Sequence, residues 1–149
     1  MLPNQPRILA SDIDGTLLLD GAPTPGLDTL RLLLRHARVD ARLVYATGRS
    51  FAETQALIDT GVLPPPAAIA AMVGTELWFP PWKGPDPDYA ASLHQDWDRD
   101  AVASLVAALP EVSPQPRHYQ SDLKASFYCE DPQIELRVTS LLDERGLEA

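Results

Sequence analysis

Apolar and polar positions in the first half of the chain follow two periods, one typical of strands and one typical of helices. Three short apolar runs predict strands: 7–13, 42–46 and 67–73. Between them, leucines recur at helical spacing after Pro25, and a second helical segment covers 51–59. This alternation is typical of an α/β fold with a parallel sheet and right-handed crossovers. We therefore predict a Rossmann-like sheet in which 7–13 is a buried strand.

The residues at the helix ends support these boundaries. Thr24 directly precedes Pro25, and this pair is typical of a helix start. Ser50 and Glu53 have the spacing of a capping box, in which each satisfies a backbone group of the other. Gly61 follows the second helical segment and is suited to end it.

The pattern changes near residue 80. A short strand at 76–79 leads into a proline-rich stretch, 80–87, which we expect to be a weakly structured joint. Beyond it the sequence predicts two strands and two helices: 98–109, near Val112, 124–129 and 132–145. We therefore predict two domains, 1–80 and 81–149, of which the second mixes helices and strands.

The composition disfavours two classes of partner. The formal net charge of −9 and the pI near 4.6 argue against binding to nucleic acids and to anionic membranes. No apolar run approaches the roughly 20 residues of a membrane span, and we recognise no secretory signal. The single cysteine, Cys129, lacks a partner for an internal disulfide. We expect a cytoplasmic protein with Cys129 in its core.

Two aspartates follow the first predicted strand. Asp12 and Asp14 are spaced by one residue, so their side chains point the same way along an extended chain. They should meet at the carboxyl end of the strand, where open α/β sheets bind ligands. Such a pair can hold Mg²⁺, or divide the roles of nucleophile and general acid/base. The alternative is an ordinary turn, because Asp14 and Gly15 are a common turn pair.

A second polar loop follows the strand at 42–46. Thr47 offers a hydroxyl and a backbone N–H for a phosphate oxygen, and Gly48 allows close approach of the main chain. Arg49 is suited to bind either a phosphate or a carboxylate through two parallel hydrogen bonds. The alternative is an ordinary entry into the next helix. If the sheet is parallel, this loop lies beside the aspartates.

Taken together, these loops resemble the haloacid-dehalogenase-like hydrolase superfamily. Asp12, Asp14 and Thr16 match its first motif, Thr47 matches its second, and the hairpin after Gly15 is similar to its flap. The resemblance implies that Asp12 attacks phosphorus to form an aspartyl-phosphate and that Asp14 acts as general acid/base. It also implies Mg²⁺ bound by Asp12 and by the backbone carbonyl of Asp14.

A narrower resemblance extends along most of the chain. The segments 73–77, 97–99 and 124–128 are similar to sucrose-phosphate phosphatase. This implies a sugar phosphate substrate and an inserted α+β cap that closes over the sugar. The candidate sugar contacts in the cap are Gln95, Trp97, Asp98, Arg99 and Lys124. For three of them structural roles compete: Trp97 as cap core, Asp98 as a helix N-cap and Lys124 as a solvated strand end.

The chain also departs from the superfamily pattern. The lysine of the third motif and the acidic pair of the fourth have no match; the lysines present, Lys83 and Lys124, lie in the cap-like region. We therefore expect an amino-terminal portion with a partial core, an open edge beside 7–13, and little or no phosphatase activity alone. A complementing second half or a dimer is one way to complete it. Two other functions stay open: a non-catalytic sugar- or protein-binding remnant, and a sugar phosphotransferase or phosphomutase.

Overall fold

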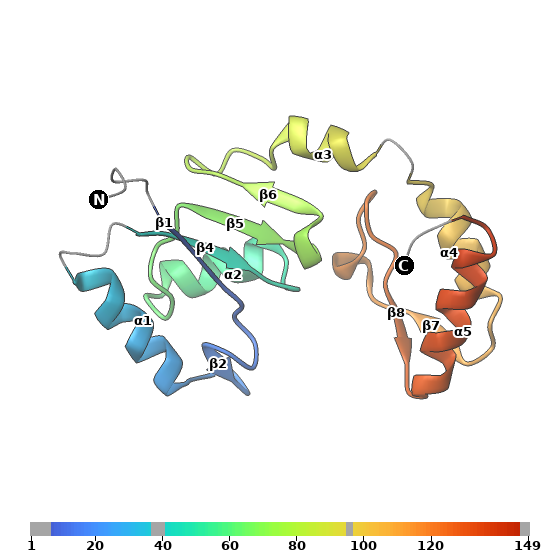
Figure 1. Cartoon of the computed structure of the whole chain (residues 1–149), viewed down its shortest axis with the longest axis horizontal. Helices are drawn as coiled ribbons and strands as arrows, with labels where there is room; N and C mark the ends of the chain where they lie inside the picture. Colours follow the sequence, from blue (N-terminus) through green and yellow to red (C-terminus); the bar gives the residue numbers. More distant parts are fainter. Residues whose placement is uncertain (1–6, 37–40, 95–96, 147–149) are drawn as a thin grey trace, which may run out of the picture. The chain divides into compact units, whose positions relative to one another are not determined.

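The computed structural model describes residues 7–36, 41–94 and 97–146 (Figure 1). They divide into two compact units, the first ending at Ala90 and the second beginning at Ala91. Compactness by itself does not define a domain, so the predicted boundary after residue 80 stays a prediction.

The first unit is built on a four-stranded sheet with the order β1–β4–β5–β6 (Figure 1). Its strands are β1 (Arg7–Ser11), β4 (Ala41–Ala46), β5 (Ala68–Ala71) and β6 (Glu76–Trp78). The first three are parallel, and β6 runs antiparallel to β5. The helices α1 (Pro25–Arg35) and α2 (Phe51–Asp59) form the two connections between parallel strands. The predicted α/β class with a parallel sheet core is therefore confirmed.

The strand β1 lies at the edge of this sheet. Its residues are exposed or half-buried, and Ile8 is 73% exposed. The prediction of a buried strand over 7–13 is wrong for 7–11 because burial in a sheet depends on a neighbour on each side. Among the described residues β1 has β4 on one side only.

The core of the first unit includes residues of the loop that follows β1. Its fully buried members include Ile13, Leu18, Leu27 and Tyr45. The carbonyl of Ile13 accepts hydrogen bonds from the N–H groups of Leu17 and Leu18, at 2.9 Å each. These bonds lead into the predicted hairpin, formed by β2 (Leu18–Leu19) and β3 (Ala22–Pro23).

The joint after β6 is more structured than the prolines suggested. Phe51 stacks on Trp78 with ring centroids 3.9 Å apart, and Trp82 packs against the same ring. A helix that the sequence analysis missed, α3 (Pro87–Leu93), follows. The Asp86 carboxylate accepts from the N–H of Tyr89 at 2.8 Å, which is the bond of an N-terminal cap.

The second unit contains helices and a short antiparallel pair of strands. Its elements are α4 (Arg99–Ala107), β7 (Val112–Pro114), the 3₁₀ turn η2 (Arg117–Tyr119), β8 (Phe127–Cys129) and α5 (Pro132–Asp143). Val102, Val106 and Leu142 form its buried centre. Cys129 is exposed, so its predicted place in the core is wrong; the outer end of a two-stranded ribbon offers little cover. Within the described segments, no helix is both long enough and apolar enough to cross a membrane.

Candidate active site

Asp12 and Asp14 lie on one side of the chain, just beyond the end of β1. Ser11 pairs with Tyr45, so β1 and β4 reach the same edge of the sheet together. Ile13, between the two aspartates, is fully buried, while both aspartates are exposed. The alternation predicted from the spacing is therefore present, and the buried isoleucine fixes which way the carboxylates face.

A bidentate ion pair joins the two predicted loops. Nε of Arg49 donates to Oδ2 of Asp14 at 2.8 Å, and Nη2 donates to Oδ1 at 2.7 Å. The hydrogen bond from Arg49 lowers the pKa of Asp14, partial burial opposes this shift, and the positive charge of Arg49 adds to the lowering. Of the two partners that the sequence left open for Arg49, the structure shows the carboxylate.

Thr47 is fixed within the second loop. It is 4% exposed, and its N–H donates to the carbonyl of Ala70 at 2.9 Å. Its side-chain oxygen accepts from the N–H of Arg49 at 3.2 Å, which leaves the hydroxyl proton available to donate. Gly48 is exposed, and a Cβ built there would meet only Val73 Cγ2, at 4.0 Å. Gly48 is therefore not required for packing, and the space above it is open.

A strained turn holds this loop from the other side. The N–H groups of Met72 and Val73 donate to the carbonyls of Arg49 and Thr47, at 2.9 Å each. Both donors have positive φ, 54° and 64°, in the left-handed region that non-glycine residues rarely adopt. Such strain is often found at functional sites. The sequence analysis used 73–77 only as a resemblance and missed this role.

The oxygen atoms at this site suit a Mg²⁺ ion that keeps most of its water ligands better than a metal ion enclosed by protein ligands. The described segments contain no group of three or more His, Cys, Asp or Glu residues that could hold a metal ion. The carboxylate of Asp14 is engaged by Arg49, and that of Asp12 makes no hydrogen bond or ion pair with the residues the structure describes. Mg²⁺ typically keeps several waters and takes only one or two carboxylates, so Asp12 with the main-chain oxygen of Asp14 would suffice to hold it.

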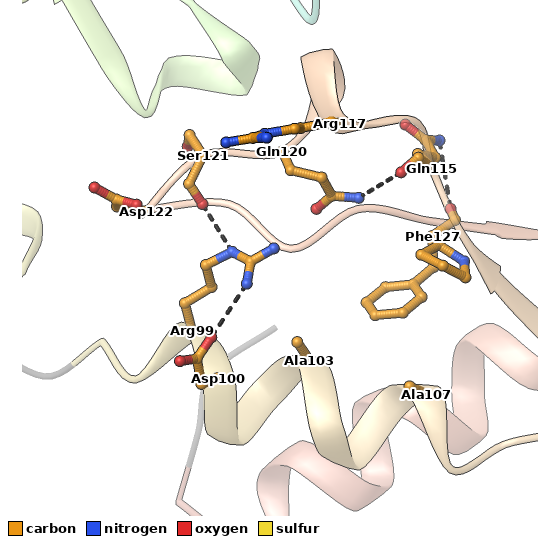
Figure 2. Close-up of a pocket in the computed structure, with 11 residues that line it drawn as sticks. Arg99, Asp100, Ala103, Ala107, Gln115, Arg117, Gln120, Ser121, Asp122 and Phe127 are labelled. Atoms are coloured by element: carbon orange, nitrogen blue, oxygen red, sulfur yellow. Dashed lines mark hydrogen bonds and ion pairs between the residues drawn. The ribbon is translucent and has the colours of Figure 1, made fainter.

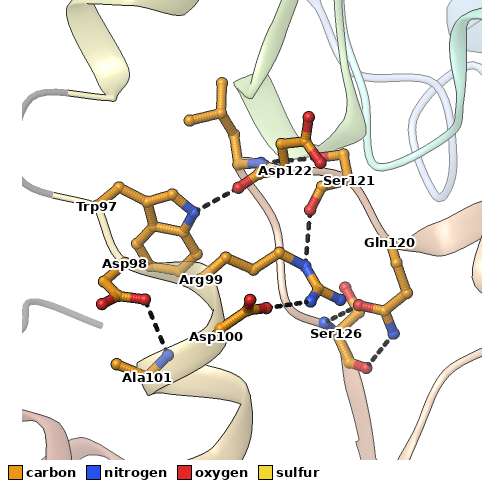
Figure 3. A network of polar contacts seen from close by, with 10 residues as sticks. Trp97, Asp98, Arg99, Asp100, Ala101, Gln120, Ser121, Asp122 and Ser126 are labelled. Carbon is orange, nitrogen blue, oxygen red and sulfur yellow. Dashed lines mark hydrogen bonds and ion pairs between the residues drawn. The ribbon is translucent and has the colours of Figure 1, made fainter.

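The predicted cap contacts make different kinds of interaction, and Figure 3 shows three of them: Trp97, Asp98 and Arg99. Trp97 packs against the centre of the second unit, and its indole N–H donates to the carbonyl of Asp122 at 2.8 Å. Asp98 caps α4 by accepting from the N–H of Ala101 at 3.0 Å. Lys124 exchanges main-chain hydrogen bonds with Ser121. These are the structural alternatives that the sequence left open for Trp97 and Asp98. Gln95 lies outside the described residues.

Arg99 lines a pocket of about 650 Å³ in the second unit, whose wall is part polar and part apolar (Figure 2). Its Nε donates to the carbonyl of Ser121 at 2.9 Å, and its Nη1 lies 3.2 Å from the Asp100 carboxylate. Other lining residues were missed by the sequence analysis: Gln115, Arg117, Gln120, Asp122 and Phe127. They belong to one irregular loop and its flanks, where no periodicity marks a common face.

The amide of Gln120 braces the wall of this pocket. It donates to the carbonyl of Gln115 at 3.0 Å (Figure 2). It also donates to the carbonyl of Ser126 at 2.7 Å and accepts from the N–H of Ser126 at 2.8 Å (Figure 3). A side chain with three main-chain bonds has little freedom, so the loop that carries Arg117 and Asp122 is held in a defined shape.

The sequence was compared with those of known proteins. Residues 5–149 match the model of the family described as sucrose-6F-phosphate phosphohydrolase. The chain belongs to this family. The resemblance to the sucrose-phosphate phosphatases of the haloacid-dehalogenase-like superfamily is thus confirmed.

Three known proteins are similar to this chain. Probable sucrose-phosphatase 3a of Arabidopsis thaliana is 34% identical over 99% of this chain and 36% of its own length. Mannosylfructose-phosphate phosphatase of Agrobacterium fabrum is 30% identical over 84% of this chain and 50% of its own. The structure of the sucrose-phosphatase from Synechocystis, solved with sucrose and phosphate, aligns with a TM-score of 0.81 at 28% identity, over 96% of this chain and 58% of that one.

This chain therefore spans about a third of the length of the Arabidopsis relative and somewhat over half of the Synechocystis structure. Family membership and fold extend over nearly all of the present residues. The activity of a whole sucrose-6F-phosphate phosphohydrolase does not follow from that coverage.

Proposed function

We propose that this chain carries the nucleophile-bearing part of a Mg²⁺-dependent sugar phosphatase. One observation supports this most strongly: the Asp12–Asp14 loop and the Thr47–Arg49 loop, separated in sequence by the hairpin, α1 and β4, are joined by the Asp14–Arg49 ion pair. Carboxylates, a hydroxyl and a guanidinium at one sheet edge are among the groups that phosphoryl transfer uses.

The proposed chemistry has two steps. A carboxylate oxygen of Asp12, which no described residue engages, attacks phosphorus as the bond to the sugar oxygen breaks. Asp14 gives that oxygen a proton, and for this step its carboxyl group has to leave Arg49 and be protonated. Water then attacks the aspartyl-phosphate, Asp14 takes up a proton from it, and inorganic phosphate leaves. Thr47 donates its hydroxyl proton to a phosphoryl oxygen, and the open space at Gly48 admits the phosphate. Bound Mg²⁺ would neutralise charge on the phosphoryl oxygens.

The pocket lined by Arg99 in the second unit is our candidate for the sugar site. Guanidinium, carboxylate and amide groups of Arg117, Asp122 and Gln115 offer the planar donors and acceptors that suit ring hydroxyls, and Phe127 adds an apolar face. Names among the relatives point to sucrose phosphate and mannosylfructose phosphate. We therefore propose a disaccharide phosphate. Among the predicted cap contacts that the structure describes, Arg99 is the one that lines the pocket.

We propose that the sheet of the first unit is completed by a further segment, and this bears on the activity of the 149 residues alone. The open edge of β1 and the 73% exposure of Ile8 support the proposal that a further segment pairs there in the functional enzyme. Without the lysine and the acidic pair of the superfamily, we expect the 149-residue chain to release little or no phosphate by itself.

A non-catalytic sugar-binding remnant is the second candidate. It is favoured by the engagement of both Asp14 oxygens by Arg49 and by the small number of metal-ligating residues at the site. In that case the second-unit pocket would bind a sugar with no turnover.

Phosphate release from a panel of disaccharide and monosaccharide phosphates tests both. The longest natural form of the protein is assayed with Mg²⁺, as wild type, as Asp12→Asn, and as Asp20→Asn, a matched change in an exposed turn. We expect release that Asp12→Asn abolishes and Asp20→Asn leaves intact. Turnover that survives Asp12→Asn refutes the nucleophile, and sugar binding without release favours the remnant. Robust Mg²⁺-dependent release by the 149 residues alone refutes their proposed incompleteness.

A further inference from the structure

The strained turn beside the Thr47 loop is three residues long. Met72, Val73 and Gly74 all have positive φ, at 54°, 64° and 82°. This left-handed region costs free energy for residues other than glycine, and it is least suited to a β-branched residue such as valine. Val73 is also 69% exposed, so the packing of its own side chain does little to offset the cost. The turn therefore depends on hydrogen bonds to keep its shape.

These hydrogen bonds reach the turn from two directions. On one side, the N–H groups of its first two residues donate to the carbonyls of Arg49 and Thr47, at 2.9 Å each. On the other side, the hydroxyl of Tyr89 donates to the carbonyl of Gly74 at 2.7 Å. The turn thus stands between Tyr89, on α3, and the loop that carries Thr47.

Tyr89 is itself held in place by the attachment of α3 to β6. The N–H of Asp86 donates to the carbonyl of Leu77 at 2.7 Å, and the Asp86 carboxylate caps the N–H of Tyr89 at 2.8 Å. Trp78 and Pro85 form an antiparallel bridge next to this contact. Because the hydroxyl comes from an attached helix, its bond can restrain the turn and does not simply follow it.

We propose that Tyr89 is a positioning residue, which keeps the Thr47 loop in place for phosphoryl binding by holding the strained turn. This inference rests on the proposed function, because it takes that loop as the phosphate site. When the hydroxyl bond is absent, the turn can leave the left-handed region and relieve its strain. The N–H bonds from the turn to the loop are then lost as well, although Tyr89 never touches the substrate.

The competing explanation is that Tyr89 only fastens α3 to the first unit. Such a bond lowers the free energy of unfolding when it is removed. It predicts no local change at the turn in the folded protein, and no effect that depends on the residue at position 73. The two explanations can therefore be separated under conditions in which every variant is folded.

The first measurement is amide hydrogen exchange on the 149-residue chain, which needs neither metal nor substrate. The loss of one hydrogen bond in Tyr89→Phe should speed exchange of the Met72 and Val73 amides about threefold to tenfold. The Leu18 amide, bonded at 2.9 Å within the loop after β1, should keep its rate. Tyr128→Phe removes the same group from an exposed position on β8, and should change none of these rates.

The second measurement is kcat/KM for a disaccharide phosphate, on the longest natural form with Mg²⁺. Tyr89→Phe should lower kcat/KM about threefold to tenfold. In a Val73→Gly background the same change should have little effect, because glycine adopts the turn without strain. In an Asp20→Gly background it should keep its full effect, because that substitution relieves a φ of 50° in the hairpin instead. A bond that affects stability alone does not give such a difference between backgrounds.

Urea unfolding shows whether each variant is folded under the conditions of both measurements. Asp86→Ala carries the same tests if Tyr89→Phe is unfolded, because it loosens the first turn of α3 and leaves the hydroxyl in place. Unchanged exchange of the Met72 and Val73 amides overturns the inference. So does faster exchange with unchanged turnover, or an equal effect of Tyr89→Phe with valine and with glycine at position 73.

The outcomes also separate this inference from the proposed function. If wild type in its longest natural form releases no phosphate from any sugar phosphate, the proposed function is refuted, and the role of the loop in phosphoryl binding is refuted with it. The exchange rates on the 149-residue chain still decide whether Tyr89 holds the turn. If turnover is present and lost in Asp12→Asn, unchanged exchange rates in Tyr89→Phe refute the positioning role alone.

Discussion

Replacement of Ile13 by alanine should be one of the most damaging single changes in the first unit. Ile13 is 0% exposed, and the change removes three carbons from a fully packed site. At about 0.8 kcal/mol per buried methylene the transfer loss is about 2.4 kcal/mol. The cavity left behind adds to this, and measured changes of this kind reach about 2–5 kcal/mol. That is a large share of the roughly 5–15 kcal/mol by which a folded domain is stable.

Ile8 provides the matched control, because the same three carbons are removed from the same stretch of chain. Roughly a quarter of Ile8 is covered, so Ile8→Ala should lower the free energy of unfolding by less than about 1 kcal/mol. Urea denaturation of the 149-residue chain, followed by circular dichroism, measures both. Equal losses for the two variants would mean that β1 is covered in solution, and the description of its face as open would be wrong.

Three further changes have smaller expected effects. Tyr45→Phe removes the bond from the buried phenol to the Pro64 carbonyl, and should cost about 1–2 kcal/mol in urea unfolding. Ser50→Ala breaks the capping box of α2 and should cost about 1 kcal/mol, with Ser50→Gly close to wild type by the same measurement. Because Arg49 lowers the pKa of Asp14 below its ordinary 3.8, their ion pair contributes stability above that pH and loses it as the pH falls through the lowered value. Both groups are near solvent, so the contribution is at most about 1 kcal/mol, and acid unfolding of Arg49→Gln should lack it.

Features with local causes could be predicted from the sequence. The helix α2 begins after the capping box of Ser50 and ends before Gly61, as predicted, because side chains close in sequence determine both ends. The alternation around Ile13 is equally local. The helix α3 was missed although Asp86 and Pro87 are suited to begin a helix, because the surrounding prolines favoured a loop.

Features with distant causes could not be predicted in this way. The chemistry of Arg49 suits a phosphate and a carboxylate equally, and the choice depends on how closely two loops 35 residues apart approach each other. The exposure of Ile8 and Cys129 depends on whether another strand lies beside them. The type of the residue itself does not indicate this. The loop around the second-unit pocket has no period, so its lining residues became visible only in the folded chain.

The proposed nucleophile and the open edge of the sheet belong to one segment of the chain. Whether that edge is paired can therefore affect catalysis. Asp12 directly follows β1, whose main chain is bonded to β4 on one side only among the described residues. A strand added on the other side would hold β1 by further main-chain bonds and cover Ile8, and thereby restrict the segment that aims Asp12. We expect the amide of Ile8 to exchange faster with solvent in the 149-residue chain than in the longest natural form, in parallel with lower turnover. Equal protection of this amide in both forms would show that the pairing of β1 does not control turnover. The low activity expected of the 149-residue chain would then have to come from the lysine and the acidic residues that it lacks.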